Sequence, residues 1–210
     1  MVNRIRATRQ RRPPGVILWR GPSRIDGKPI VAIATGLAQP SSNRVTGPAI
    51  QVWIVRSHVH PLDAVRRGQD RSVCGDCPHR GTTCYVQVWR EVSQVWRNYR
   101  RGLYPAFEPD MLSLFQGRPI RCGAYGDPAA IPTEVWRRLR RVAGGWLAYT
   151  HQWDQPWCDP ALRELCMASV DSPPQRERAL ALGWKTFRVR TPDEPVLPGD
   201  EKATDFAWPP

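Results

Sequence analysis

The sequence predicts an α/β fold, a partial (open) parallel β/α barrel preceded by a small β-rich N-terminal segment. Strand-like and helix-like segments alternate over residues 87–190, which favours parallel strands joined by right-handed crossovers. Three β-like runs precede them within residues 15–56. The chain has 210 residues. A closed eightfold barrel typically needs about 250 residues, so we expect the barrel to stay open.

The β-like runs are short, apolar and rich in β-branched and aromatic residues, a composition typical of strands. Proline, serine, asparagine and glycine in residues 39–48 indicate a loop between the second and third runs. The expected elements here are strands over Val16–Trp19, Pro29–Ala34 and Ile50–Val55, and a short helix over Pro61–Arg67.

Apolar residues recur at three- and four-residue steps from Val88 to Leu103, which predicts one amphipathic helix with arginines on its other face. Later helices carry their own start signals: Thr133 is expected to cap one, and Ser172 with Gln175 forms a capping box for another. The expected strands are Pro119–Tyr125, Trp146–Thr150, Cys166–Val170 and Lys185–Val189, with a further short helix after Asp159.

The two ends of the chain differ in composition from the rest. Residues 1–14 hold five arginines and predict a mobile basic arm, while the proline-rich, acidic residues 191–210 predict an irregular tail. Residues 15–190 are expected to form a single α/β domain, with a β-rich part (15–56), a cysteine loop (70–86) and the alternating part (87–190).

The charge is strongly positive: 31 Lys and Arg against 19 Asp and Glu give a net charge of +12. Nearly all of the positive charge is carried by arginine, whose planar guanidinium binds phosphate through two hydrogen bonds. Arginine pairs on the polar faces of the expected helices therefore predict nucleic acid as a partner, although solvated helix faces explain them as well. These pairs are Arg100-Arg101, Arg137-Arg138 and Arg140-Arg141.

No apolar run approaches the roughly 18 residues of a membrane span, and the basic N-terminus lacks the apolar stretch of a secretory signal. We therefore expect a cytoplasmic protein with no membrane partner. Disulfides are rare in that compartment, so the six cysteines are interpreted as metal ligands or buried thiols.

The sharpest motif is Cys74-Gly-Asp-Cys77-Pro-His-Arg-Gly-Thr-Thr-Cys84. A Cys-x-x-Cys knuckle directs two sulfurs at one metal centre, and a third cysteine follows seven residues later. Thiolates hold zinc or an iron–sulfur cluster, and the spacing leaves that choice open. Either the site keeps an open position, or a fourth ligand comes from His79, His58, His60 or Cys122.

Polar residues follow three of the expected parallel strands: Gly126-Asp127, then His151, then Asp171-Ser172. Ligands bind at the carboxyl ends of parallel strands. Aspartate and serine also cap helices, and Ser172 is interpreted in that way. For Asp127 and His151 both interpretations stay open.

The order of these features resembles the radical S-adenosylmethionine superfamily, over roughly residues 50–190. That family has a partial parallel barrel with a cysteine loop after its first barrel strand. Gly126-Asp127-Pro128 is similar to its Gly-Glu-Pro element, which contacts the methionine amino group, and Ser169-Val170-Asp171 is similar to its later motif near the ribose. The family spaces its cysteines by three residues and then two, whereas this chain has two and then six.

The chain also resembles uncharacterised proteins of phages and prophages that carry the Cys-Gly-Asp-Cys-Pro-His-Arg and Gly-Asp-Pro-Ala-Ala signatures. That group implies a mobile-element origin in a bacterial host, but no reaction. Its members often continue into a second cysteine cluster, whereas this chain ends in Phe206-Ala-Trp-Pro-Pro; a truncated or diverged copy is expected only if that second cluster is needed for function.

The leading hypothesis is therefore a phage- or mobile-element-encoded, cysteine-ligated metalloprotein, for which the resemblance implies a radical S-adenosylmethionine-like enzyme acting on nucleic acid or a nucleotide. The resemblance implies an iron–sulfur cluster on Cys74, Cys77 and Cys84. It also implies S-adenosylmethionine seated by Gly126, Asp127 and Asp171, and we expect His151 to face the cavity as a substrate contact or acid–base group. The alternative is a non-enzymatic nucleic-acid-binding protein in which the same cysteines bind structural zinc.

Overall fold

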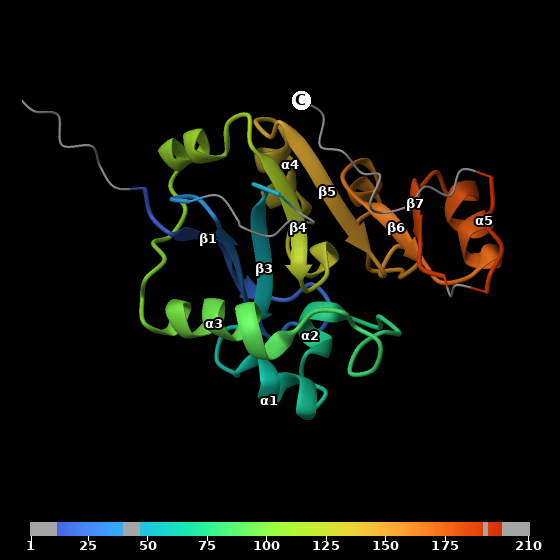
Figure 1. Ribbon diagram of the computed structural model, residues 1–210, viewed down its shortest axis with the longest axis horizontal. Coiled ribbons are helices and arrows are strands. Elements are labelled where there is room, and N and C mark those ends of the chain that lie inside the picture. Colours follow the sequence, from blue (N-terminus) through green and yellow to red (C-terminus); the bar gives the residue numbers. More distant parts are fainter. Residues whose placement is uncertain (1–11, 40–46, 191–192, 199–210) are drawn as a thin grey trace, which may run out of the picture.

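The computed structural model describes residues 12–39, 47–190 and 193–198 (Figure 1). A mixed, open sheet of seven strands forms its centre, and the strands lie side by side in their order along the chain. β1, β2 and β3 pair antiparallel, and β3 to β7 pair parallel. The strands are β1 (Gly15–Pro22), β2 (Pro29–Thr35), β3 (Ile50–Arg56), β4 (Pro119–Tyr125), β5 (Gly145–Thr150), β6 (Met167–Val170) and β7 (Thr186–Arg188).

Helices occupy each parallel connection except that between β5 and β6, where only a 3₁₀ turn, η4 (Pro160–Glu164), occurs. The long connection from β3 to β4 holds α1 (Pro61–Arg66), α2 (Arg71–Cys74), the π-helical turn η1 (Val88–Val92), α3 (Ser93–Arg100) and the 3₁₀ helix η2 (Pro109–Phe115). The later connections hold η3 (Pro128–Ala130), α4 (Thr133–Arg140) and α5 (Pro173–Ala181). Within the described residues no helix has both the length and the apolar character needed to cross a membrane.

The prediction of one helix from Val88 to Leu103 is wrong at both ends. The backbone breaks at Arg90 (φ −93°, ψ −108°), and the Ser93 hydroxyl donates to the Val88 carbonyl five residues earlier at 2.7 Å, which closes a wide turn. Regular α-helix begins only at Ser93 and ends at Arg100.

The prediction that Thr133 caps α4 is also wrong. Pro132 occupies the cap position, makes no side-chain cap bond, and Thr133 is the first helical residue. The Thr133 side chain is instead buried near the Asp159 carboxylate, whose pKa it lowers. The basic arm and the irregular tail lie almost wholly outside the described residues, which include only 12–14 and 193–198 of them.

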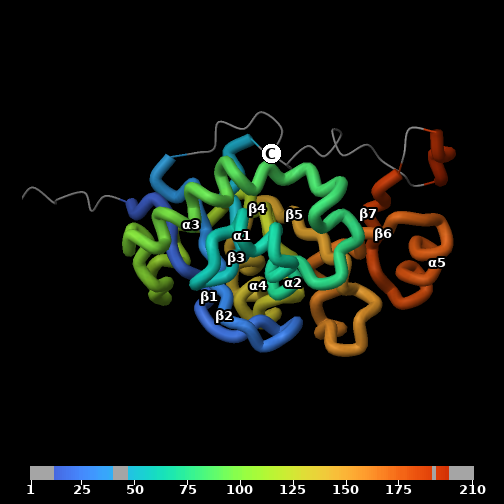
Figure 2. Tube along the Cα trace, turned by 90° about the horizontal axis from the view of Figure 1, so that it is seen from below, coloured from blue at the N-terminus to red at the C-terminus, as the bar shows by residue number. Residues whose placement is uncertain are grey.

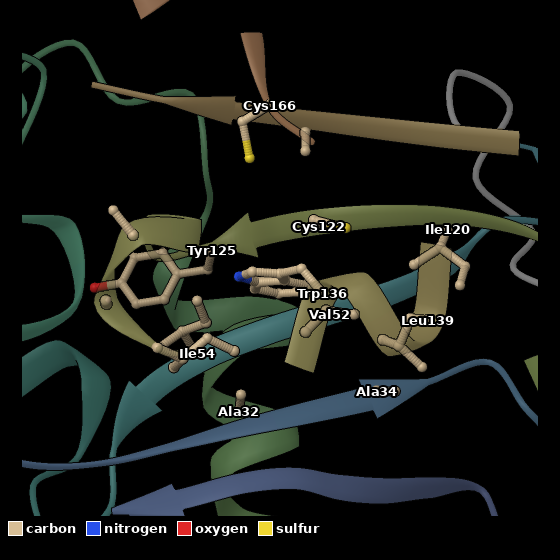
Figure 3. Close-up of a cluster of buried hydrophobic side chains, with 14 of the residues drawn as sticks. Ala32, Ala34, Val52, Ile54, Ile120, Cys122, Tyr125, Trp136, Leu139 and Cys166 are labelled. Atoms are coloured by element: carbon tan, nitrogen blue, oxygen red, sulfur yellow. The ribbon is translucent and has the colours of Figure 1, made fainter. Parts of the chain in front are cut away.

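One face of the sheet carries the main apolar core (Figure 3). Trp136 and Leu139 of α4 are buried against this face, where Ile120 and Cys122 project from β4. The Trp136 indole donates to the Pro128 carbonyl at 2.9 Å. Because side chains alternate along a strand, every second residue of β4 points the other way.

Helices α1 and α2 lie at the carboxyl ends of β3 and β4 (Figures 1 and 2). The Asp127 amide, just beyond β4, donates to the Val73 carbonyl of α2 at 2.6 Å. This bond fixes the end of α2 over the sheet edge where ligands bind in parallel α/β folds, and α2 itself occupies the start of the cysteine loop predicted over residues 70–86.

Candidate metal and cofactor site

A cavity of about 520 Å³ lies between the cysteine loop and the parallel part of the sheet. Its volume is within the range of small-molecule and cofactor sites. Six of the seven residues singled out from the sequence line it: Cys74, Cys77, Cys84, Gly126, Asp127 and His151.

Strand alternation supplies the floor of the cavity. Arg121, Gly123 and Tyr125 of β4 line it, and so do Leu147 and Tyr149 of β5. Of the residues between them, Cys122 and Ala148 pack in the core, while Ala124 also borders the cavity. The alternation of side chains along β4 and β5 therefore determines which of them face the cavity and which face the core.

Gln152 holds the first turn of the cysteine loop. Its fully buried side chain donates from Nε2 to the Cys74 carbonyl at 3.1 Å and accepts from the Asp76 amide through Oε1 at 3.3 Å. Between them Gly75 has a φ of +59°, and a Cβ there would lie 2.3 Å from the Gln152 side chain. Only glycine allows this approach, which explains the glycine within the Cys-x-x-Cys knuckle.

Arg80 ties the same loop to the preceding helices. Its guanidinium donates to Asp70 Oδ2 at 3.1 Å and to the Gly75 carbonyl at 2.8 Å, and the Asp70 side chain is 4% exposed. Sequence reasoning missed the roles of Arg80 and Gln152. The signal for Arg80 was its place within the motif, whereas Gln152 lies two residues beyond Thr150, the last residue of β5.

Burial raises the pKa of the Cys74 thiol well above its usual range, and nearby acidic groups add to the effect. Burial likewise raises the pKa of Cys77 to about 11. The uncharged thiols are thus the stable forms in the chain alone. A bound cation is the partner that would stabilise both as thiolates.

The three cysteine sulfurs do not form a preorganised tetrahedral zinc site. Zn–S bonds of about 2.3 Å put the sulfurs of such a site roughly 3.8 Å apart. Among the described residues, the one group of three or more His, Cys, Asp or Glu ligand atoms within 4.8 Å of one another contains no cysteine. A cluster binds each thiolate through a different iron and needs more widely spaced sulfurs.

Asp127 joins the ends of β4 and β5. Oδ1 accepts from the Ala129 amide at 2.9 Å and from the Thr150 hydroxyl at 2.7 Å, and Oδ2 accepts from the His151 amide at 2.8 Å. Burial raises the pKa of Asp127 to about 6, although the hydrogen bonds act in the opposite direction. Asp127 thus caps η3, as the helix-cap interpretation expected, and also borders the cavity.

The group identified by these distances consists of His79, His151 and Asp171. His79 is hydrogen-bonded through Nδ1 to Thr83 Oγ1 at 2.6 Å and through Nε2 to Asp171 Oδ1 at 2.8 Å. His151 Nε2 lies 4.0 Å from Asp171 Oδ2. Burial lowers the pKa of His151, and His79 lowers it further, while Asp171 opposes both.

Asp171 itself is not among the residues that line the cavity. It touches His79, which does line it. The other fourth-ligand candidates are engaged elsewhere: His60 Nδ1 accepts from the Leu62 amide at the start of α1, His58 contacts Arg100, and Cys122 lies in the core.

The chain was compared with protein-family models, with curated proteins and with solved structures, and none of the three comparisons finds a match.

Proposed function

We propose that the protein is a cysteine-ligated metalloenzyme of the radical S-adenosylmethionine type, with Cys74, Cys77 and Cys84 as ligands of an iron–sulfur cluster. One observation carries this proposal: the three cysteines line the same cavity as Gly126, Asp127 and His151. These residues come from separate segments of the chain, and a merely structural metal site has no need of a shared cavity.

The strand order supports the partial-barrel part of the proposal. Doubly wound folds reverse their strand order at a switch point, where ligands bind. In this chain β3 to β7 follow one another without reversal, as the strands of a β/α barrel do. Five consecutive parallel strands preceded by β1 and β2 are the arrangement that such an open barrel would have.

The residues present fit both groups. Burial raises the pKa of the Cys74 and Cys77 thiols, which a bound cation would offset, and Cys84 is exposed. Asp127 Oδ2 accepts a hydrogen bond from the His151 amide, and its second lone pair keeps capacity for the amino group of S-adenosylmethionine. The cluster would supply the electron that cleaves this cosubstrate. Asp171, which lies outside the cavity lining, would act through His79 and His151.

The test is the iron and acid-labile sulfide content of protein purified without oxygen, with the visible spectrum. We expect both elements in the wild type and their loss in Cys77→Ala. Cys158→Ala is the matched control, because Cys158 is also half-buried but does not line the cavity. Full iron content in Cys77→Ala would refute the assignment. Binding of S-adenosylmethionine to the loaded protein, and its weakening in Asp127→Asn, tests the cosubstrate.

Nucleic acid or a nucleotide remains the proposed substrate, on the ground of the +12 charge. Zinc without sulfide, together with nucleic-acid binding that weakens steeply with salt, would instead favour the non-enzymatic alternative. The phage or mobile-element origin and the cytoplasmic location stay predictions.

A further inference from the structure

We infer that His79, His151 and Asp171 form a second metal site, for a divalent transition-metal ion of the zinc class. This inference goes beyond the proposed function, because it uses none of the three cysteines. Two imidazoles and one carboxylate are the ligands that such ions take at catalytic sites, with a further position left open.

The geometry of the three side chains carries the inference. Their ligand atoms lie within 4.8 Å of one another, and the imidazole rings stand steeply inclined at 68° with centroids 5.4 Å apart. An ion about 2.1 Å from each ligand atom needs these atoms roughly 3.4 Å apart, so His79 and Asp171 would exchange their 2.8 Å hydrogen bond for bonds to the ion. They come from three segments: the cysteine loop, the end of β5 and the end of β6.

A second observation is the state of His151 Nε2. This atom is buried and has no hydrogen-bond partner among the described residues. Buried polar nitrogens are seldom left without a partner. The carboxylate of Asp171 is 4.0 Å away, too far for a hydrogen bond. An ion between the two would give His151 Nε2 the partner it lacks.

His79 and Asp171 also have hydrogen bonds that hold them in place, as metal ligands need. A ligating imidazole usually donates its other N–H to a neighbouring oxygen, which fixes the ring. Thr83 Oγ1 lies 2.6 Å from His79 Nδ1 and provides that oxygen. The Asp171 amide donates to Gln175 Oε1 at 2.7 Å, which fixes the backbone that bears the carboxylate.

Two of the three ligands line the cavity, so the open coordination position faces its interior. There the ion would bind and polarise an oxygen atom of a ligand. The cysteines would hold their cluster elsewhere on the cavity wall, and the cavity would thus contain two different metal centres.

The test uses Co²⁺ alone as probe, added to the full-length chain in which Cys74, Cys77 and Cys84 are all replaced by serine. We expect one Co²⁺ per chain, with a visible spectrum of nitrogen and oxygen ligation and no sulfur-to-metal charge-transfer band. His151→Ala and Asp171→Asn in this background should abolish binding, and Thr83→Val should weaken it by about tenfold. His58→Ala and Asp154→Asn are the matched controls, because neither residue belongs to the group.

Unchanged Co²⁺ binding in both His151→Ala and Asp171→Asn would overturn the inference, as would the absence of binding to the serine variant. If the serine variant does not fold, the spectrum of metal-free wild type titrated with Co²⁺ decides: a second equivalent without sulfur charge transfer supports the site, and sulfur bands alone refute it. Loss of iron and sulfide in cysteine variants concerns only the cluster, so the two proposals fail separately.

Discussion

The side chain of Gln152 is hydrogen-bonded to the backbone carbonyl of Cys74, 78 residues away in the sequence, at 3.1 Å. This contact fixes the first proposed cluster ligand to the end of β5, so the buried Gln152 amide is one of the links between the cysteine loop and the sheet.

Replacing that amide should loosen the loop. Gln152→Leu leaves the Cys74 carbonyl and the Asp76 amide without their partner, and we expect a loss of about 1–3 kcal/mol in the free energy of unfolding together with a lower metal content. Urea denaturation and metal analysis measure the two effects. Gln94→Leu on α3, whose side chain is exposed, is the control. Equal stability of the two variants would contradict the assigned role.

Gly126 should not tolerate alanine. Its φ is +82°, and a Cβ would lie 2.7 Å from Ile54 Cβ, so Gly126→Ala adds a collision to backbone strain. Gly102→Ala isolates the strain, because Gly102 has a φ of +74° and a Cβ there would meet nothing within 4 Å. We expect Gly126→Ala to unfold more easily than Gly102→Ala by about 1–3 kcal/mol, measured by urea denaturation. Equal losses of unfolding free energy in Gly126→Ala and Gly102→Ala would show that the structure relieves the collision at residue 126 without cost.

The raised pKa of Asp127 predicts how the stability of the fold depends on pH. Burial raises this pKa to about 6 in the folded chain, against about 3.9 in the unfolded chain. Between these values the folded state binds more protons, so the contribution of Asp127 to stability is fully present below pH 4 and is lost as the pH rises to 6. The loss is about 3 kcal/mol.

Asp127→Asn should remove this decline. Urea denaturation of metal-free protein from pH 4 to 7 gives the free energy of unfolding at each pH. The slope of this energy against pH is then compared between Asp127→Asn and wild type. Asp63→Asn serves as the control, since that carboxylate is exposed on α1. An identical slope for wild type and Asp127→Asn would contradict the raised pKa.

The core prediction concerns Trp136. Trp136→Phe removes the donor to the Pro128 carbonyl and leaves a void beneath α4, and we expect a loss of about 2–4 kcal/mol. Trp89→Phe, at a residue that is 62% exposed, should change stability by less than about 0.5 kcal/mol. Thermal or urea unfolding of both variants gives the comparison, and losses of the same size would count against this packing.

Local signals predicted most strand positions. β4 runs from Pro119 to Tyr125 as expected, because a proline and a Gly-Asp-Pro turn mark its ends. Periodicity failed at Val88, since the Ser93 hydroxyl competes for its carbonyl, a bond that apolar spacing does not encode.

The candidate site likewise contains residues that the sequence predicted and residues that it did not. The cysteine motif and the strand-end residues were visible in the sequence because each is a local pattern. The grouping of His79 with His151 and Asp171 was not, because it depends on how the loop folds back across β5 and β6. Gln152 was missed for the same reason: a glutamine after a strand has no distinctive pattern until its distant partner is known.

The alternation along β4 and β5 has a consequence for how this cavity can diversify. Arg121 and Tyr149 line the cavity, whereas Cys122 and Ala148 pack in the core. Substitutions at Arg121 or Tyr149 change the shape and charge offered to a ligand while the packing that holds the sheet to α4 is preserved. A new ligand preference can therefore arise through single changes on one side of two strands, without a compensating mutation elsewhere in the chain.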